Sequence, residues 1–307
     1  MATFSANFAE LMETRQKMIF FKEFAQEELQ FPKLFQRRPS TKSHEDRLRV
    51  AGLGTFQSKP EGAPVAFDDP IQGTRRRVTH STFALGTRST WEAIRDDQWD
   101  ILDKMPADMG DSGRDHMERV AWDLINDGFT GNRHTGLDGL QLFTTAHTTL
   151  RPEVATQSNS LNPPLELSVT GLETILTLAR LTVSEEGRFT PVSVSRLLYH
   201  PDEQHNAYVL LDTEFRPGSG DNDRSTVRST RSGLTPVEER GVPYLTSSTA
   251  WSVHVPPGRN SLTWNDREQM FFQRGNDANT FDQLHYAAYR ASVMFSEWRG
   301  NYGSNFA

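Results

Sequence analysis

The residues of this chain that could carry out catalysis begin with Gly110-Asp111-Ser112-Gly113, which matches the sequence around a serine-protease nucleophile. Thr144-Thr145-Ala146-His147 faintly resembles the histidine motif of the same enzymes. Chymotrypsin-type enzymes place histidine before aspartate before serine, whereas here the serine comes first. We therefore interpret the glycine motif as a junction between two helices, in which Asp111 or Ser112 caps the second. A soluble serine hydrolase built on the Asp111/Ser112 loop is the alternative from a different functional class.

Metal and cofactor chemistry has little support in the sequence. His200 and His205 do not share one helical face, and the other histidines lack the spacing of metal ligands. The sequence contains no phosphate-binding Gly-x-x-x-x-Gly-Lys motif, dinucleotide fingerprint or nucleophile elbow. The absence of cysteine excludes disulfides, thiolate metal sites and cysteine nucleophiles. We expect no catalytic residue, metal or cofactor, and we interpret two acidic pairs as solvated loops: Asp108/Asp111 and Asp221/Asp223.

Composition narrows the class of protein further. The chain has 307 residues, enough to bury a sizeable core in one or two domains. Its 33 basic and 40 acidic residues give a net charge of −7, which argues against a dedicated nucleic-acid binder. No apolar run approaches the ~20 residues that a membrane-spanning helix needs. Met18-Ile19-Phe20-Phe21 is too short for a signal peptide, so we expect a protein that is neither secreted nor membrane-inserted.

Residues 1–51 have the pattern of an N-terminal arm. Phe8, Leu11 and Ile19 recur at helical spacing, and Pro32 then prevents a regular continuation of the helix. A charged, polar run follows at residues 36–46. This segment either docks on another subunit or packs on its own domain, and the sequence does not favour one over the other.

Residues 52–90 predict an extended β-hairpin. They are rich in glycine and proline and contain two β-type runs, Pro64–Phe67 and Val78–Leu85. Asp68-Asp69 and Arg75-Arg76-Arg77 place charges of opposite sign between the two runs. A two-stranded ribbon is marginal alone in water, so we expect it to lie on a partner surface.

The remaining elements predict an α+β protein. A helical pattern from Thr90 is interrupted at Pro106, Gly110 and Gly113, and a second helix follows to Phe129. Further helices are expected around Leu172, with Thr170 and Glu173 as a capping box, and from Pro201 to Leu211. The expected strands are Leu140–Phe143, Pro191–His200, Val242–Leu245, Ala250–Val255, Met270–Gln273 and Leu284–Trp298.

The order of several short segments resembles the major capsid proteins of tailed bacteriophages, particularly the Mu-like major head subunit. No single segment is specific, but the set is co-linear over nearly the whole chain. The segments are Gly52-Leu53-Gly54, Pro60-Glu61-Gly62, Phe83-Ala84-Leu85-Gly86, Asn126-Asp127-Gly128-Phe129, Leu142-Phe143 with His147, Leu197 to Pro201, Pro243-Tyr244-Leu245-Thr246 and Trp298-Arg299-Gly300.

The resemblance implies a Hong Kong 97-type fold and a structural, non-enzymatic role. Such a subunit assembles into hexamers and pentamers of an icosahedral shell that encloses double-stranded DNA without sequence-specific binding. Scaffold, portal or decoration proteins are possible partners, and assembly in the host bacterial cytoplasm leads to the virion. An encapsulin-like protein compartment is the alternative on the same fold. The implied parts are an N-terminal arm (1–51), an extended hairpin loop (52–90), a peripheral domain with a spine helix (91–139 and 256–307) and an axial domain (140–255).

The charged hairpin supplies the candidate interface. Opposite charges on one ribbon could pair across a seam between symmetry-related copies, although an exposed basic turn is an equally simple interpretation. Nucleic-acid contact ranks third, because no aromatic side chain alternates with the arginines for base stacking. The candidate interface residues are Glu61, Asp68, Asp69, Arg75, Arg76 and Arg77.

Overall fold

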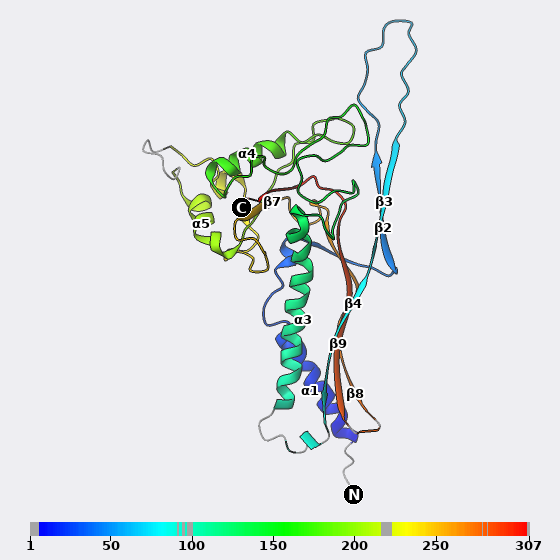
Figure 1. The fold of residues 1–307 in the computed structure, drawn as a ribbon, viewed down its shortest axis with the longest axis vertical. Coiled ribbons are helices and arrows are strands. Elements are labelled where there is room, and N and C mark those ends of the chain that lie inside the picture. The colour runs from blue at the N-terminus through cyan, green and yellow to red at the C-terminus, as the bar shows by residue number, and fades with distance from the viewer. Residues whose placement is uncertain are drawn as a thin grey trace.

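The computed structural model describes residues 6–90, 92–93, 96, 101–215, 223–277, 279–280 and 282–305, with the side chains of 6–13 and 101–103 outside that description. Trp91, where a helix was expected to begin, and the Gly218–Asn222 loop also lie outside the described residues. The molecule is elongated, with a narrow stalk, a wider upper body and a long ribbon that projects beyond that body (Figure 1).

The described helices are α1 (Ala6–Phe24), α3 (Ile101–Asn126), α4 (Val169–Arg180), α5 (Gln204–Asp212) and α6 (Ser229–Ser232), with 3-10 turns at Phe31–Lys33, Asp127–Phe129 and Pro201–Glu203. The strands are β1 (Gln36–Pro39), β2 (His44–Ala51), β3 (Ile71–Thr79), β4 (Ser81–Ser89), β5 (Arg196–Leu198), β6 (Thr235–Pro236), β7 (Ala250–His254), β8 (Leu262–Asn276), β9 (Gln283–Phe295) and β10 (Asn301–Asn305). This mixture confirms the α+β class.

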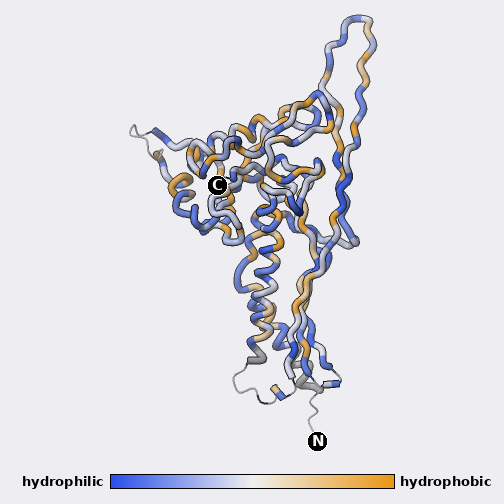
Figure 2. The backbone as a smooth tube through the Cα atoms, in the orientation of Figure 1, coloured by the Kyte–Doolittle hydropathy of each residue, from blue (hydrophilic) through white to orange (hydrophobic). Residues whose placement is uncertain are grey.

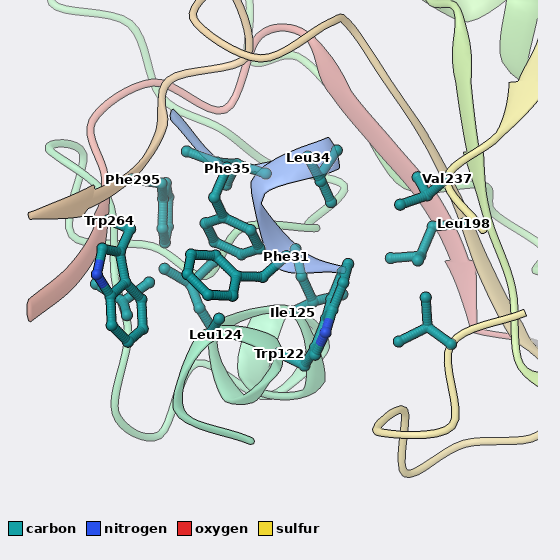
Figure 3. Packing of buried hydrophobic residues seen from close by; sticks show 14 of the residues in the cluster. Phe31, Leu34, Phe35, Trp122, Leu124, Ile125, Leu198, Val237, Trp264 and Phe295 are labelled. Carbon is teal, nitrogen blue, oxygen red and sulfur yellow. The ribbon is translucent and has the colours of Figure 1, made fainter. Parts of the chain in front are cut away.

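The stalk is a four-stranded sheet in the order β1-β8-β9-β4, with α1 and α3 packed against it. Large aromatic side chains fill the space between helix and sheet at its upper end (Figure 3). The Phe31 and Trp264 rings lie 4.7 Å apart, and Phe35 meets Trp122 edge-on at 5.8 Å. Burial of each such ring contributes roughly 1.5–3 kcal/mol, so these contacts hold α3 along the sheet.

The upper body has a core of its own around a second sheet, in the order β10-β7-β5-β6. Trp251 and Tyr302 are almost completely buried there beneath α4. The Ser168 side chain caps α4 by accepting a hydrogen bond from the Gly171 N–H at 3.1 Å. The predicted capping box at Thr170 and Glu173 is therefore misplaced, because the helix begins earlier.

The N-terminal segment packs on its own chain in this structure. Phe20 of α1 is fully buried, and its ring lies 5.1 Å from that of Phe272 on β8. The buried Glu118 carboxylate of α3 accepts hydrogen bonds from the Phe31 N–H at 3.2 Å and the Trp122 indole N–H at 2.7 Å. These contacts favour the second of the two interpretations of the arm.

The interruption that the sequence suggested in the spine helix is absent from the described residues, because α3 is one helix of 26 residues that contains Pro106, Gly110 and Gly113. Gly110 lies where α1 crosses α3. A Cβ at this position would lie 2.6 Å from the Phe20 carbonyl oxygen and 3.1 Å from the Phe24 nitrogen. The glycine therefore allows two backbones to approach closely and does not provide a turn.

The hairpin also differs from its predicted boundaries of 52–90. Its strands are β2 and β3, which pair antiparallel from His44↔Thr79 to Ala51↔Ile71. β4 pairs instead with β9 in the stalk, so the predicted Val78–Leu85 strand divides at His80. Figure 2 shows mostly hydrophilic residues along β2 and β3. The alternating pattern continues through His80, whereas the pairing of β4 with β9 and the packing of Phe83 against Tyr289 distinguish the two strands.

Two other predicted strands are wrong. Leu142 and Phe143 are buried, but Leu140–Phe143 forms bends and irregular backbone. Val242 is also buried in a loop, where Gly241 has a φ of 77° and Pro243 offers no N–H to a ladder. An apolar run thus indicated burial correctly, but not a strand. The helix from Pro201 and the strands around residues 250–254, 270–273 and 284–295 are confirmed, whereas only Arg196–Leu198 of the predicted Pro191–His200 strand forms one.

Gly110 and Gly113 of α3 provide a matched pair of variants that tests the close approach of α1 and α3. Gly110→Ala should destabilise the protein, because backbone atoms of α1 would have to move. Gly113→Ala meets only the flexible Met270 Cε at 2.8 Å and should be neutral or stabilising by up to ~1 kcal/mol. Thermal and urea unfolding of the dispersed subunit would measure both. Equal stability of the two variants would contradict the proposed close approach.

Candidate functional site

The Asp111/Ser112 segment lacks the geometry of a hydrolase. Both residues lie within α3, whose N–H groups are used by helical hydrogen bonds. Ser112 lines a cavity with His116, but His116 Nδ1 is 2.7 Å from the Tyr289 hydroxyl. The Asp111 carboxylate lies 3.4 Å from Arg114 and so does not orient His116. Among the described residues, no group of three or more histidine, aspartate or glutamate side chains could hold a metal ion.

The basic run on β3 finds partners within its own chain. Arg75 and Arg77 both donate to Asp46 on the neighbouring strand β2. Hydrogen bonds from Arg77 and Arg75 hold the pKa of Asp46 well below its usual range. Arg76 donates to the Thr135 hydroxyl in the loop after α3. Asp46 was not among the predicted site residues, because only strand pairing places it opposite the arginines.

The acidic candidates Glu61, Asp68 and Asp69 lie at the far end of the ribbon, and one of them, Asp68, also finds partners within its own chain. Asp68 accepts from Arg151 at 2.7 and 3.1 Å and from the Gly54 N–H at 2.6 Å, and these bonds lower its pKa. Arg151 also contacts the Asp69 carbonyl oxygen at 3.3 Å. The carboxylates of Glu61 and Asp69 have no ion-pair partner in the part of the chain that the structure describes. The structure therefore does not bring the six predicted residues together within one subunit.

A buried ion cluster fastens the paired strands of the ribbon to the body, near the end of β2 that leads to the tip. The Glu185 carboxylate lies 2.8 Å from Arg49 Nη2 of β2 and 3.2 Å from Arg299 Nη1 near the C-terminus. It also accepts the Leu150 N–H at 2.8 Å. All three charged side chains are only 10–11% exposed. Sequence reasoning missed this cluster because its members lie more than 100 positions apart, which leaves no local pattern.

Close packing supports the same attachment. A Cβ at Gly73 of β3 would lie 2.7 Å from a methyl group of Leu150. Thr74 donates to the Leu137 carbonyl oxygen in the same region. The shaft of the ribbon, which consists of β2 and β3, is thus held by its own subunit. This differs from the expectation that the whole ribbon needs a neighbour.

The ribbon tip, residues 53–67, carries the most exposed large apolar side chains of this region. Phe56 and Phe67 have relative exposures of 107% and 95%, and Leu53 and Val65 have 55% and 61%. The tip extends beyond the upper body (Figure 1). Two fully solvated phenylalanine rings close together in sequence are unusual on an isolated surface and indicate a contact that the subunit alone does not supply.

Two of the segments that suggested a family from sequence, the one with Leu142-Phe143 and His147 and the one with Trp298-Arg299-Gly300, meet inside the molecule. His147 stacks on Trp298 with ring centroids 4.4 Å apart. The Asn159 side chain joins both segments, because its Nδ2 donates to the Leu142 and Asn301 carbonyl oxygens at 2.6 and 2.8 Å. The residues around 139–147 and 296–304 therefore act together in positioning the core.

The elongated architecture defines the class of protein as a Hong Kong 97-type capsid fold. The capsid of an empty GTA particle shares 12% identity at a TM-score of 0.58, covering 91% of this chain and 90% of that one. The mature capsid of bacteriophage PhiM1 shares 12% identity at 0.56, covering 89% and 85%. The procapsid of bacteriophage JBD30 shares 15% identity at 0.52, covering 99% and 77%.

Sequence comparison gives the family. The family model described as phage capsid protein matches residues 74–302, well over half of the chain. The chain belongs to the phage capsid protein family, which confirms the resemblance to tailed-phage major capsid proteins and its non-enzymatic, structural class. An encapsulin-like compartment is not favoured.

No curated protein matches the sequence. The chain spans 63% and 64% of the capsid chains in two other JBD30 structures, slightly less than two thirds of their length.

Within the described residues, no helix is long and apolar enough to cross a membrane.

The ion cluster formed by Arg49, Glu185 and Arg299 can be tested directly. Glu185→Gln leaves two buried arginines without their shared carboxylate and should lower the free energy of unfolding by roughly 3 kcal/mol. Asp46→Asn removes a more exposed partner of two arginines and should have a much smaller effect. Urea unfolding gives the energies, and amide exchange in β2 and β3 should rise only in Glu185→Gln. Unchanged exchange would show that packing alone holds the ribbon.

Proposed function

We propose that this chain is a structural subunit of a tailed-phage head, which self-assembles through hexamers and pentamers into an icosahedral shell enclosing double-stranded DNA. The observation that carries the proposal is the ribbon tip. Its exposed rings have no cover within the described subunit, while the shaft beneath them is rigidly held. A fixed shaft with an apolar end is suited to contact a neighbouring copy.

The charge of the chain supports a container for nucleic acid better than a binder of it. The net charge of −7 would oppose tight, irreversible contact with packaged DNA. Contacts between copies need not be strong individually, because closure of a symmetric shell makes the later contacts effectively intramolecular. We propose a shell held without covalent cross-links, assembled in the host bacterial cytoplasm and retained in the virion. Scaffold, portal and decoration proteins would be its further partners.

The observed strands refine the proposed division into parts. The arm would extend to about residue 43, and the hairpin would cover His44–Thr79. β4, α3, β8 and β9 would form the peripheral domain, with α3 as its spine. The body with α4, α5 and β7 would be the axial domain, close to its predicted range of 140–255.

The charged ribbon residues are proposed as a secondary contact between copies. Among the described residues, Arg75 and Arg77 share the single acidic partner Asp46 and Arg76 bonds to the neutral Thr135, so the shaft keeps a positive excess. Glu61 and Asp69 at the other end are the candidates of opposite charge. A seam that pairs the shaft of one copy with the tip of another would weaken with salt, because exposed charges are screened over about 8–10 Å.

The tip predicts a measurable effect on assembly. Electron microscopy of the purified wild-type chain should show large closed particles. Phe56→Ser with Phe67→Ser should keep the thermal stability of the dispersed subunit, because both rings are solvated, yet yield few or no particles. Phe56→Leu with Phe67→Leu retains apolar area and should assemble. Normal particles from the serine variant would remove the tip from the interface, and no particles from wild type would contradict the shell.

The arginines predict a separate, salt-dependent effect. Replacing Arg75, Arg76 and Arg77 by serine should change subunit stability little but reduce the yield of particles, most clearly at moderate salt. Light scattering over a range of ionic strength would follow this, with Arg240→Ser, an exposed arginine elsewhere, as the control. If the triple variant assembled like wild type at every ionic strength, the run would be a solvated part of the ribbon.

A further inference from the structure

β4 presents an unprotected strand edge. It lies at one side of the stalk sheet and pairs with β9 along all nine residues, from Ser81↔Ala291 to Ser89↔Gln283, without a bulge. In the described part of the chain, no other backbone hydrogen bond reaches β4. Edge strands are usually protected by lysine, proline or a bulge, because a free edge pairs readily with another strand. β4 has none of these.

We infer that β4 pairs with β4 of a second copy, antiparallel about a twofold axis that passes through Leu85. This inference rests on the proposed shell, because joining hexamers and pentamers requires contacts between copies of different rings, and a twofold contact uses the same surface on both. The pairing would join two stalk sheets into one continuous sheet.

The sequence of β4 complements itself in this register. Leu85 would lie opposite Leu85 of the second copy, and it is 49% exposed in the single subunit. Ala84 would oppose Gly86, so two small residues meet on the other face. Phe83 would oppose Thr87, an aromatic and β-branched pair of the kind that stabilises antiparallel strands. No position forces a large side chain against another large one except the central leucines.

Charge also permits this pairing. Arg88 is the only charged residue of β4, and in the proposed register it opposes Thr82. The two arginines would be about 20 Å apart along the strands, since each residue advances about 3.4 Å. That is more than twice the screening length of about 8–10 Å. Arg88 is moreover already paired with Asp282 at 2.6 Å and Asp277 at 3.3 Å.

A cavity beside the edge explains why the central position is apolar. It lies between α3 and the sheet, with a volume of about 360 Å³, and is lined by Leu85, Met109, Gly113, Met270 and Ala287 among others. Leu85 forms part of its rim. A second leucine at this point would cover apolar surface that the single subunit leaves open. The favourable burial would therefore be centred on the twofold axis.

The absence of cysteine makes this register testable by cross-linking. Leu85→Cys places two thiols opposite each other, where Cβ atoms of paired strands lie about 4.5–5.5 Å apart, close to disulfide geometry. Thr82→Cys is the matched control, because its symmetry mate would be about 20 Å away. Both variants would be oxidised, or treated with a short bis-maleimide, as assembled particles and as dispersed chain.

Leu85→Cys particles should give at least about tenfold more covalent dimer than Thr82→Cys particles on non-reducing gels. Dimer at the level of the Thr82→Cys control would overturn the pairing. Dimer between Leu85→Cys and Phe67→Cys chains, but not among Leu85→Cys chains, would overturn it too and assign the edge to a ribbon tip. Microscopy of the same samples separates the two proposals: particles without the cross-link overturn the β4 pairing and leave the shell standing, whereas the absence of any particles contradicts the shell. Leu85→Lys should retain its unfolding temperature and lose particle yield.

Discussion

The two sheets of this subunit are joined by one connected set of buried hydrogen bonds centred on Asn301. Its Nδ2 donates to the Asn260 carbonyl oxygen at 2.8 Å, and its Oδ1 lies 2.8 Å from His254 Nδ1. Asn260 in turn donates to the Leu34 carbonyl oxygen of the arm at 2.7 Å. A buried polar group without a partner costs about 1–3 kcal/mol, so these bonds largely determine how arm, stalk and body meet. Burial lowers the pKa of His254 to about 4, which keeps it neutral within the network.

This network suits a molecule without a single compact core. The apolar burial is divided between two large clusters, one around Trp122 that also includes Leu198 and Val237 of the body, and one around Trp251. Apolar contacts are not directional, and two cores packed side by side could slide or rotate. Directed hydrogen bonds between asparagines, histidine and backbone specify one arrangement. A shell subunit needs such a fixed shape, because small errors in one copy would accumulate around a closed assembly.

The interior contrasts with the periphery. Arg49, Glu185 and Arg299 are buried and form ion pairs that fix β2 of the ribbon to the body. The ribbon tip with Phe56 and Phe67, and the free edge of β4, have no such cover in the described chain. Stabilising contacts are thus concentrated where the subunit must be rigid. Exposed apolar side chains remain at the ribbon tip, and an unpaired strand edge remains at β4. In the proposed shell, these two surfaces would let one chain form rings and also join rings.

The sequence by itself determined the α+β class, the lack of a plausible active site, several elements such as α4, α5 and β9, and the resemblance to the capsid family. These follow from local periodicity, residue types and the order of segments, which are all present in the linear chain. Tertiary structure alone decided that Gly110 serves a helix crossing, that Leu142 and Val242 are buried in loops, and that β4 leaves the ribbon for the stalk. It also decided that Arg75 and Arg77 bind Asp46 and that Glu185 binds Arg49 and Arg299. The reason is physical: each of these outcomes depends on a neighbour distant in sequence, whose position is set by packing of the whole chain and not by local preference.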